Sequence, residues 1–107
     1  MKYLEFDVNF FSRPEIILIE SMDNGSEHVY VLLKLMMIAA NKGMDGALMI
    51  TKDIPMTYEM IAGLVGVSVN EAKEAIEAFL RFGLITNKDG VFVMNDMPDV
   101  ADTDEDF

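Results

Sequence analysis

The sequence predicts an α+β domain, a winged helix-turn-helix with an extra strand and an extra helix at its N-terminus. Two observations predict this fold. Residues 57–82 have the pattern of two short helices separated by a turn that contains Gly66, and residues 84–94 have the pattern of a β-hairpin. A long apolar helix and a short strand precede them, over residues 27–50. This order of elements is typical of a winged helix, and a generic α+β domain with a helical hairpin is the alternative.

The chain begins with an alternating pattern that predicts a strand over residues 3–10. Apolar side chains occupy every second position in this segment: Leu4, Phe6, Val8 and Phe10. A period of two residues places these side chains on one face of a half-buried strand.

A capping box follows the strand and predicts a short helix. Ser12 is placed to cap the first free amides, and Glu15, three residues later, is placed to reach back to it. Pro14 falls at a position where a missing N–H group costs nothing. We expect this helix to run to about Met22, where the turn-forming residues 23–25 end it.

Residues 27–42 predict a long central helix between an N-cap at Ser26 and a stop at Gly43. Its polar positions are spaced by seven residues and form one narrow stripe: Glu27, Lys34 and Asn41. Nearly every other position is apolar, so we expect the helix to be buried on almost all sides. Residues 47–50 then predict a short strand, and residues 52–55 predict a loop.

The predicted helix-turn-helix depends on two cap residues and one glycine. Thr57 is a candidate cap for a helix that ends near Val65, and Ser68 begins a second capping box. Gly66 supplies the left-handed conformation that the turn needs. We expect the two helices to pack through six apolar side chains: Ile61, Leu64, Val65, Val69, Ala72 and Ile76.

The composition is that of one globular domain with a strong excess of acid. The chain has 107 residues, of which 51% are hydrophobic and 25% are charged, and its formal net charge is −11. This charge excludes a strongly basic nucleic-acid binder. The final residues, 95–107, contain acids and no base. We therefore divide the chain into a winged-helix domain over residues 1–97 and an acidic tail, or the start of a linker, over residues 98–107.

The residue types also limit the chemistry that the chain can perform. Cysteine is absent, His28 is the single histidine, and no set of acids, bases or nucleophiles has a catalytic spacing. No secretion signal and no apolar run of the length of a membrane helix is present. We expect a cytoplasmic protein that is not an enzyme, has no metal site and no cofactor, makes no membrane contact, and acts by binding.

The apolar pattern resembles a known family. The similarity is carried by Tyr3-Leu4-Glu5-Phe6, the following residues 7–11, Gly25, the helix over residues 29–40, Gly46-Ala47-Leu48 and the predicted winged-helix core. In these residues the chain is similar to the N-terminal domain of phage replisome organisers, which are relatives of the primosomal DnaD protein. The resemblance implies a winged helix at the start of a longer replication-initiation protein. It also implies origin DNA binding, self-association and delivery of the replicative helicase.

The second helix of the predicted helix-turn-helix and the hairpin carry the residues expected to contact DNA. Asn70 is the candidate for reading a base edge, because an asparagine amide pairs bidentately with adenine. Phosphate contacts are expected from three bases: Lys73, Arg81 and Lys88. The same elements carry four acids: Glu71, Glu74, Glu77 and Asp89. We therefore expect this fragment to bind DNA weakly.

Two other functions remain open at this point. The acidic second helix favours a domain that acts only through protein contacts, by oligomerising or by docking a helicase or its loader. A transcriptional regulator that shares only the fold is the third possibility.

The first short helix contains four consecutive apolar residues, Ile16-Ile17-Leu18-Ile19. A short surface helix needs only one apolar face, so either the domain wraps this helix completely or part of it meets another chain. The hypothesis that we retain is a homo-oligomer built from residues 3–22, with Ile17 and Leu18 in the interface.

Overall fold

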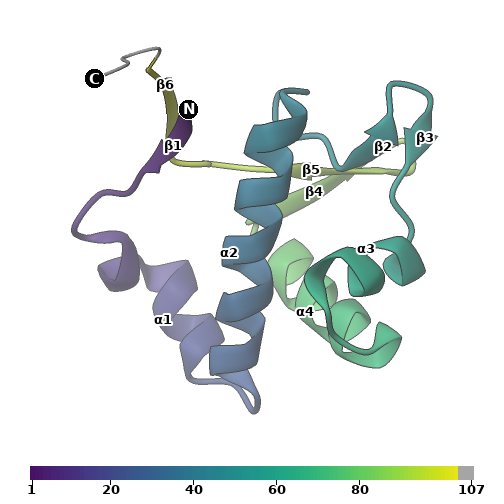
Figure 1. The fold of residues 1–107 in the computed structure, drawn as a ribbon. Coiled ribbons are helices and arrows are strands. Elements are labelled where there is room, and N and C mark those ends of the chain that lie inside the picture. Colours follow the sequence, from purple (N-terminus) through teal and green to yellow (C-terminus); the bar gives the residue numbers. More distant parts are fainter. Residues whose placement is uncertain (104–107) are drawn as a thin grey trace.

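The long helix α2 (Gly25–Lys42) runs through the middle of the molecule in the computed structural model, which describes residues 1–103. The short helix α1 (Pro14–Glu20) lies on one side of α2, and α3 (Tyr58–Val65) and α4 (Val69–Arg81) lie on the other side (Figure 1). The remaining elements are β1 (Lys2–Glu5), the 3-10 turn η1 (Phe10–Ser12), β2 (Met49–Thr51), β3 (Ile54–Pro55), β4 (Ile85–Lys88), β5 (Val91–Met94) and β6 (Asp99–Asp102).

The caps of the helix-turn-helix lie where the sequence predicts them. The hydroxyl of Thr57 accepts a hydrogen bond from the amide of Met60 at 3.2 Å, and the hydroxyl of Ser68 accepts one from the amide of Glu71 at 3.1 Å. Between the helices, Gly66 has a φ of 86°, a left-handed conformation that favours glycine. These local interactions confirm the predicted starts of both helices and the turn between them.

Fewer side chains are buried between α3 and α4 than the six that the sequence predicts. Ile61, Val65, Ala72 and Ile76 are buried, but Leu64 and Val69 are about half exposed. The reason is the direction of the buried faces. On α3, the buried face is centred between Ile61, Ala62 and Val65, so Leu64 lies to one side of it. Leu64 and Val69 therefore do not belong to the buried part of this interface.

The hairpin of β4 and β5 has a tight two-residue turn. Lys88 pairs with Val91, and both intervening residues, Asp89 and Gly90, have positive φ angles of 53° and 87°. Such angles are typical of the type I′ turn that suits the twist of a hairpin. The side chain of Asn87 accepts a hydrogen bond from the amide of Gly90 at 2.9 Å and so holds the turn.

A third backbone segment pairs with the free edge of β5. The amide of Leu48 donates to the carbonyl of Phe92, and the amide of Met94 donates to the carbonyl of Gly46, each at 2.8 Å. A helix, a short strand segment, a helix-turn-helix and a hairpin therefore follow one another as in a winged helix. The predicted α+β class is confirmed. The predicted loop at residues 52–55 partly differs, because Ile54–Pro55 forms β3 and pairs with β2.

The N-terminal strand is shorter than the alternating pattern predicts. β1 ends at Glu5, and Val8 is 98% exposed instead of lying on a buried face. The carboxylate of Asp7 accepts a hydrogen bond from the amide of Asn9 at 2.7 Å, and the amide of Phe10 donates to the carbonyl of Asp7. This local aspartate turn ends the strand because it offers the backbone hydrogen bonds that compete with strand pairing.

The predicted capping box at Ser12 does not form, because Ser12 belongs to η1 and Arg13 is the N-cap of α1. Pro14 occupies the first turn, as expected. The carboxylate of Glu15 pairs with the Arg13 side chain instead of reaching back to Ser12. A backbone hydrogen bond at the start of the helix, together with Arg13, lowers the pKa of Glu15.

The acidic C-terminal segment was expected to be a solvated tail, but residues 99–102 form strand β6. β6 pairs with β1 in antiparallel register, with Lys2 opposite Asp102 and Glu5 opposite Asp99. The pairing occurs because β1 otherwise has unpaired backbone groups on both edges, and a partly buried Met97 anchors the segment that leads to β6. Residues 104–107 of the predicted tail lie outside the described residues.

The core is centred on α2 and extends to both sides of it. The largest fully buried side chains are Phe79, Ile16, Ile19, Leu32, Leu35, Met36, Leu48, Ile61, Ile76, Leu84, Ile85 and Val31. The exposed side of α2 is wider than the predicted polar stripe, because Tyr30 and Met37 lie on it between Glu27, Lys34 and Asn41.

Replacing Gly46 by alanine is expected to destabilise the domain by about 1–3 kcal/mol. Gly46 has a φ of 84°, and a Cβ atom there would lie 2.8 Å from the carbonyl oxygen of Met94. Chemical denaturation measures the change in the free energy of unfolding. Gly63→Ala is the matched control, since it lies in α3 with open space around it and should leave stability unchanged or raise it by about 0.5–1 kcal/mol. Equal stability of Gly46→Ala and the native chain would contradict this account.

Candidate functional site

The exposed face of α4 is the candidate nucleic-acid interface. The opposite face packs into the core through Ala72, Ala75, Ile76 and Phe79. The helical period therefore turns the polar residues outward, and three of the four residues predicted to contact DNA lie exposed together on this face: Asn70, Lys73 and Arg81.

The amide of Asn70 already has a partner on the same helix. Its Nδ2 atom donates a hydrogen bond to Oε1 of Glu74 at 3.2 Å. Reading an adenine edge requires both the amide nitrogen and the amide oxygen of an asparagine. Base recognition by Asn70 would therefore use the second hydrogen of its amide nitrogen or break this contact, and in either case it would bring the Glu74 carboxylate close to the DNA.

Arg81 lies among carboxylates near the C-terminal end of α4. Together with Glu74 and Glu77, it lines an open hollow between α4 and the start of α2. The hollow also includes Asp23 and His28, and the latter is buried. The guanidinium group of Arg81 stacks over the ring of Phe82, 5.3 Å from its centroid. These surroundings reduce the positive potential that Arg81 offers to a phosphate.

Lys88 is the fourth predicted contact and lies apart from the other three, at the end of β4 (Figure 1). Its side chain is exposed, and Asp89 follows it in the turn. The exposed charges of α4, two bases and two acids, cancel formally, and the half-buried Glu71 makes the helix negative. The interface therefore has the shape of a DNA-reading helix but lacks its positive charge.

The outer face of α1 is a second candidate surface. Ile16 and Ile19 are completely buried, whereas Ile17 is 51% exposed and Leu18 is 49% exposed. Phe11, just before α1, is also half exposed and was not identified from the sequence. The signal for it was the pair Phe10-Phe11, because only one of two adjacent aromatic rings turns inward, and this ring is Phe10.

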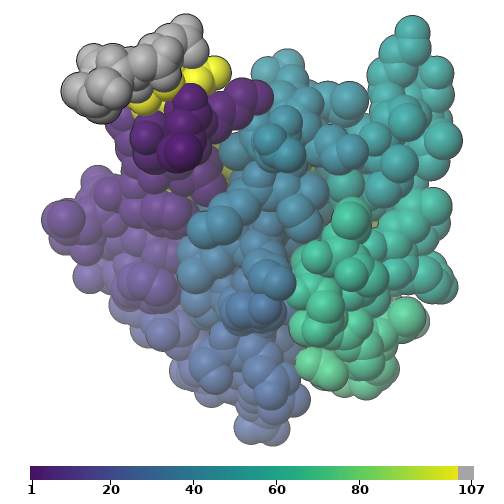
Figure 2. Space-filling view, in the orientation of Figure 1, coloured from purple at the N-terminus to yellow at the C-terminus, as the bar shows by residue number. Residues whose placement is uncertain are grey.

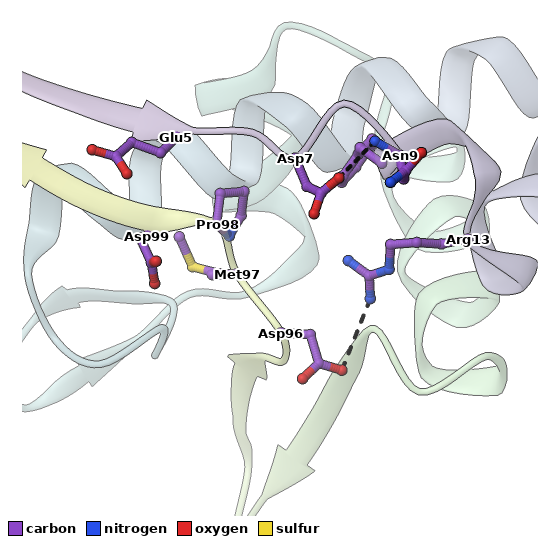
Figure 3. A pocket seen from close by; sticks show the side chains of 9 residues that line it. Glu5, Asp7, Asn9, Arg13, Asp96, Met97, Pro98 and Asp99 are labelled. Carbon is purple, nitrogen blue, oxygen red and sulfur yellow. Dashed lines mark hydrogen bonds and ion pairs between the residues drawn. The ribbon is translucent and has the colours of Figure 1, made fainter.

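An acidic hollow lies beside the start of α1. Figure 3 shows the side chain of Arg13 reaching toward Asp96, whose carboxylate is 3.9 Å from the guanidinium group. Three further carboxylates line the hollow, from Glu5, Asp7 and Asp99. Within residues 1–103, no three acidic, histidine or cysteine side chains are grouped so that they could hold a metal ion. The contact of Arg13 with Asp96 links α1 to the segment between β5 and β6.

Of the helices in residues 1–103, none is both long enough and apolar enough to cross a membrane. The fold and the exposed faces define a small α+β domain of the helix-turn-helix and hairpin type. Residues 3–106 match the family model of the N-terminal phage replisome organiser, so the chain belongs to this family. The comparisons with curated proteins and with solved structures gave no match.

Replacing both Glu74 and Glu77 by lysine is expected to create an effective DNA-binding face on α4. Fluorescence anisotropy with a labelled duplex at low salt should show at least tenfold tighter binding than that of the native chain. The slope of log K against log salt should steepen by up to about 1.8, because two further phosphate contacts become available.

The control carries the same change of charge on other helices, as Glu20→Lys with Glu27→Lys, and both of its positions are exposed. If this control binds DNA as tightly as the Glu74→Lys, Glu77→Lys variant, net charge and not the α4 face governs binding.

Proposed function

We propose that this domain acts in replication initiation as a non-catalytic binding module that works mainly through protein contacts, including self-association, and contacts DNA only weakly. The family supports the replication-initiation role. The choice of protein contacts over DNA rests on one observation. The exposed face of α4, the helix that reads DNA in this type of fold, carries a charge that is close to neutral or negative.

Direct binding of duplex DNA by α4 and the hairpin is a minor part of the proposal. Lys73, Arg81 and Lys88 would contact phosphates, and Asn70 would approach a base. A domain that binds DNA well typically makes about 6–10 phosphate contacts. Three bases among four acids fall short of that number.

Self-association uses the outer face of α1 in this proposal. Ile17 and Leu18 expose apolar surface side by side on a two-turn helix. Burying a fully exposed side chain of this type gains roughly 1.5–3 kcal/mol, and each of these two half-exposed side chains would gain about half of that. Repulsion arising from the net charge of −11 opposes association, but charges further than about 8 Å apart are largely screened at physiological salt. An assembled module would then present several copies to a helicase or its loader.

The isolated domain is expected to bind duplex DNA no better than about 10⁻⁴ M at physiological salt, because few phosphate contacts are available. Fluorescence anisotropy with labelled duplexes of different sequence measures this affinity. A basic helix-turn-helix protein on the same duplexes serves as the positive control. Tight binding that distinguishes between sequences would overturn the preference for protein contacts.

The domain is expected to form a dimer or a larger assembly at micromolar concentration, and Ile17→Glu with Leu18→Glu should make it monomeric. Both side chains are half exposed, so the double variant should keep its fold and its thermal stability. Sedimentation equilibrium measures the mass, and circular dichroism measures the folding.

The matched control is Met60→Glu with Leu64→Glu, which adds the same charge to two exposed apolar positions of α3. It should associate like the native chain. A native chain that is monomeric at high micromolar concentration contradicts self-association, and dissociation of both double variants would assign the effect to charge alone.

A further inference from the structure

A groove of about 340 Å³ lies between β1 and the exposed side of α2. Its strand side includes Tyr3, Leu4 and Phe6, and its helix side includes Met37 and Ala40. No residue of β6 lines it, so it lies along the edge of β1 that faces away from β6. In Figure 2, the N-terminal strand, in dark purple, stands beside the blue helix α2.

The backbone along this edge of β1 is unpaired within the described residues. Met1 and Thr103 exchange two hydrogen bonds, from the N-terminal amine to the Thr103 carbonyl and from the Thr103 amide back to the Met1 carbonyl. Bonding direction alternates along an antiparallel strand, so Tyr3 and Glu5 also bond toward β6. The amide and carbonyl groups of Lys2 and Leu4 therefore point to the outer edge, beside the groove.

The groove offers apolar surface at the right place for a side chain of an added strand. Met37 is 57% exposed, Tyr3 is 48% exposed and Phe6 is 38% exposed, so all three keep apolar area that a partner could cover. Leu4 is half-buried and packs against the core, so the face of β1 that carries Leu4 is the one directed at α2. A residue placed opposite Leu4 would direct its side chain to this same face, into the groove.

The charge of the groove differs from that of the rest of the molecule. Its lining contains one base, Lys2, and no acid, although the whole chain carries a net charge of −11. The hollow near Arg13 is lined by four acids and one base. No carboxylate in residues 1–103 forms an ion pair with Lys2, and the Asp102 carboxylate opposite it contacts the N-terminal amine. The chemical complement of Lys2 is a carboxylate.

We propose that the β1–α2 groove binds an extended peptide segment of a partner protein, which adds to β1 as an antiparallel strand. The residue opposite Leu4 is apolar and fills the groove, and the residue opposite Lys2 is acidic and pairs with its ammonium group. Because the added strand runs antiparallel, the apolar residue comes first and the acid follows two positions later. Strand addition of this kind obtains affinity from backbone hydrogen bonds and specificity from alternate side chains.

A second copy of β1 satisfies these requirements less well. In an antiparallel pair, residues that bond outward lie opposite one another, so Lys2 would face the copy's Lys2, Leu4 or Phe6. The copy's Glu5 bonds toward its own β6 and cannot lie directly opposite Lys2. The charge of Lys2 would therefore stay unmatched in a strand-to-strand dimer.

The test uses two fluorescein-labelled seven-residue peptides with alternating threonine and valine around a central Leu-Thr-Glu or a central Leu-Thr-Lys. The native chain is expected to bind the Leu-Thr-Glu peptide at least tenfold more tightly. Lys2→Glu should reverse this preference, and Met37→Glu should weaken binding of the Leu-Thr-Glu peptide at least tenfold. Met60→Glu is the matched control, since it changes an exposed methionine of α3 outside the groove, and it should bind as the native chain does.

Amide hydrogen exchange gives a second measurement, because a nonspecific contact would not slow the exchange of particular backbone amides. The amides of Lys2 and Leu4 should exchange rapidly in the free protein and slowly with the Leu-Thr-Glu peptide, whereas those of Tyr3 and Glu5 should be slow in both. If neither peptide binds the native chain at millimolar concentration, the proposal is overturned. It is also overturned if Met37→Glu and the native chain bind the Leu-Thr-Glu peptide equally tightly. Protection of Lys2 and Leu4 that rises with protein concentration, in step with mass in sedimentation, would assign the groove to a second copy.

Discussion

The burial of α2 between two groups of helices is the constraint on which the other features of the structure depend. Leu32, Leu35 and Met36 are completely buried, and burying each such side chain contributes roughly 1.5–3 kcal/mol. α1 packs on one side of this helix, and α3 and α4 pack on the other side. Lys34 adds a polar link, because its ammonium group donates to the carbonyl of Val65 at the end of α3. The orientation of α4, and with it the candidate DNA-binding face, follows from this packing.

The same packing fixes the position of the outer face of α4 but not its charge. α4 has an apolar inner face and a polar outer face, and nothing in the fold requires the outer face to be acidic. Glu74 and Glu77 are exposed, and the Glu74 carboxylate accepts the amide of Asn70 instead of neutralising a base. A helix-turn-helix architecture therefore supports DNA binding only as far as its surface charge allows. In this chain, apolar side chains are exposed on α1 and in the β1–α2 groove, whereas the exposed bases and acids of α4 are equal in number.

Only some of the features that depend on neighbours in the sequence were predicted correctly, because the capping box at Ser12 does not form and the N-cap of α2 is Asn24 instead of Ser26. The caps at Thr57 and Ser68, the turn at Gly66 and the presence of the hairpin were predicted correctly, and the caps and the turn are set by contacts over three or four residues. The prediction also failed where the pairing partner of a strand lies far along the chain. β6 pairs with β1 across about a hundred residues, and its acidic composition resembles that of a solvated segment. The alternation over residues 3–10 predicted a strand that is too long, because the hydrogen-bonded turn at Asp7 ends β1 at Glu5.

The sequence by itself determined the class of the domain and which residues share the outer face of α4, because helical periodicity places Asn70, Lys73 and Arg81 together. The tertiary structure decided which apolar side chains remain exposed. Periodicity alone could not distinguish Ile16 and Ile19 from Ile17 and Leu18, since the direction of burial depends on where α2 lies. The β1–α2 groove is also a product of tertiary structure, because its two walls come from segments about thirty residues apart that only packing brings together.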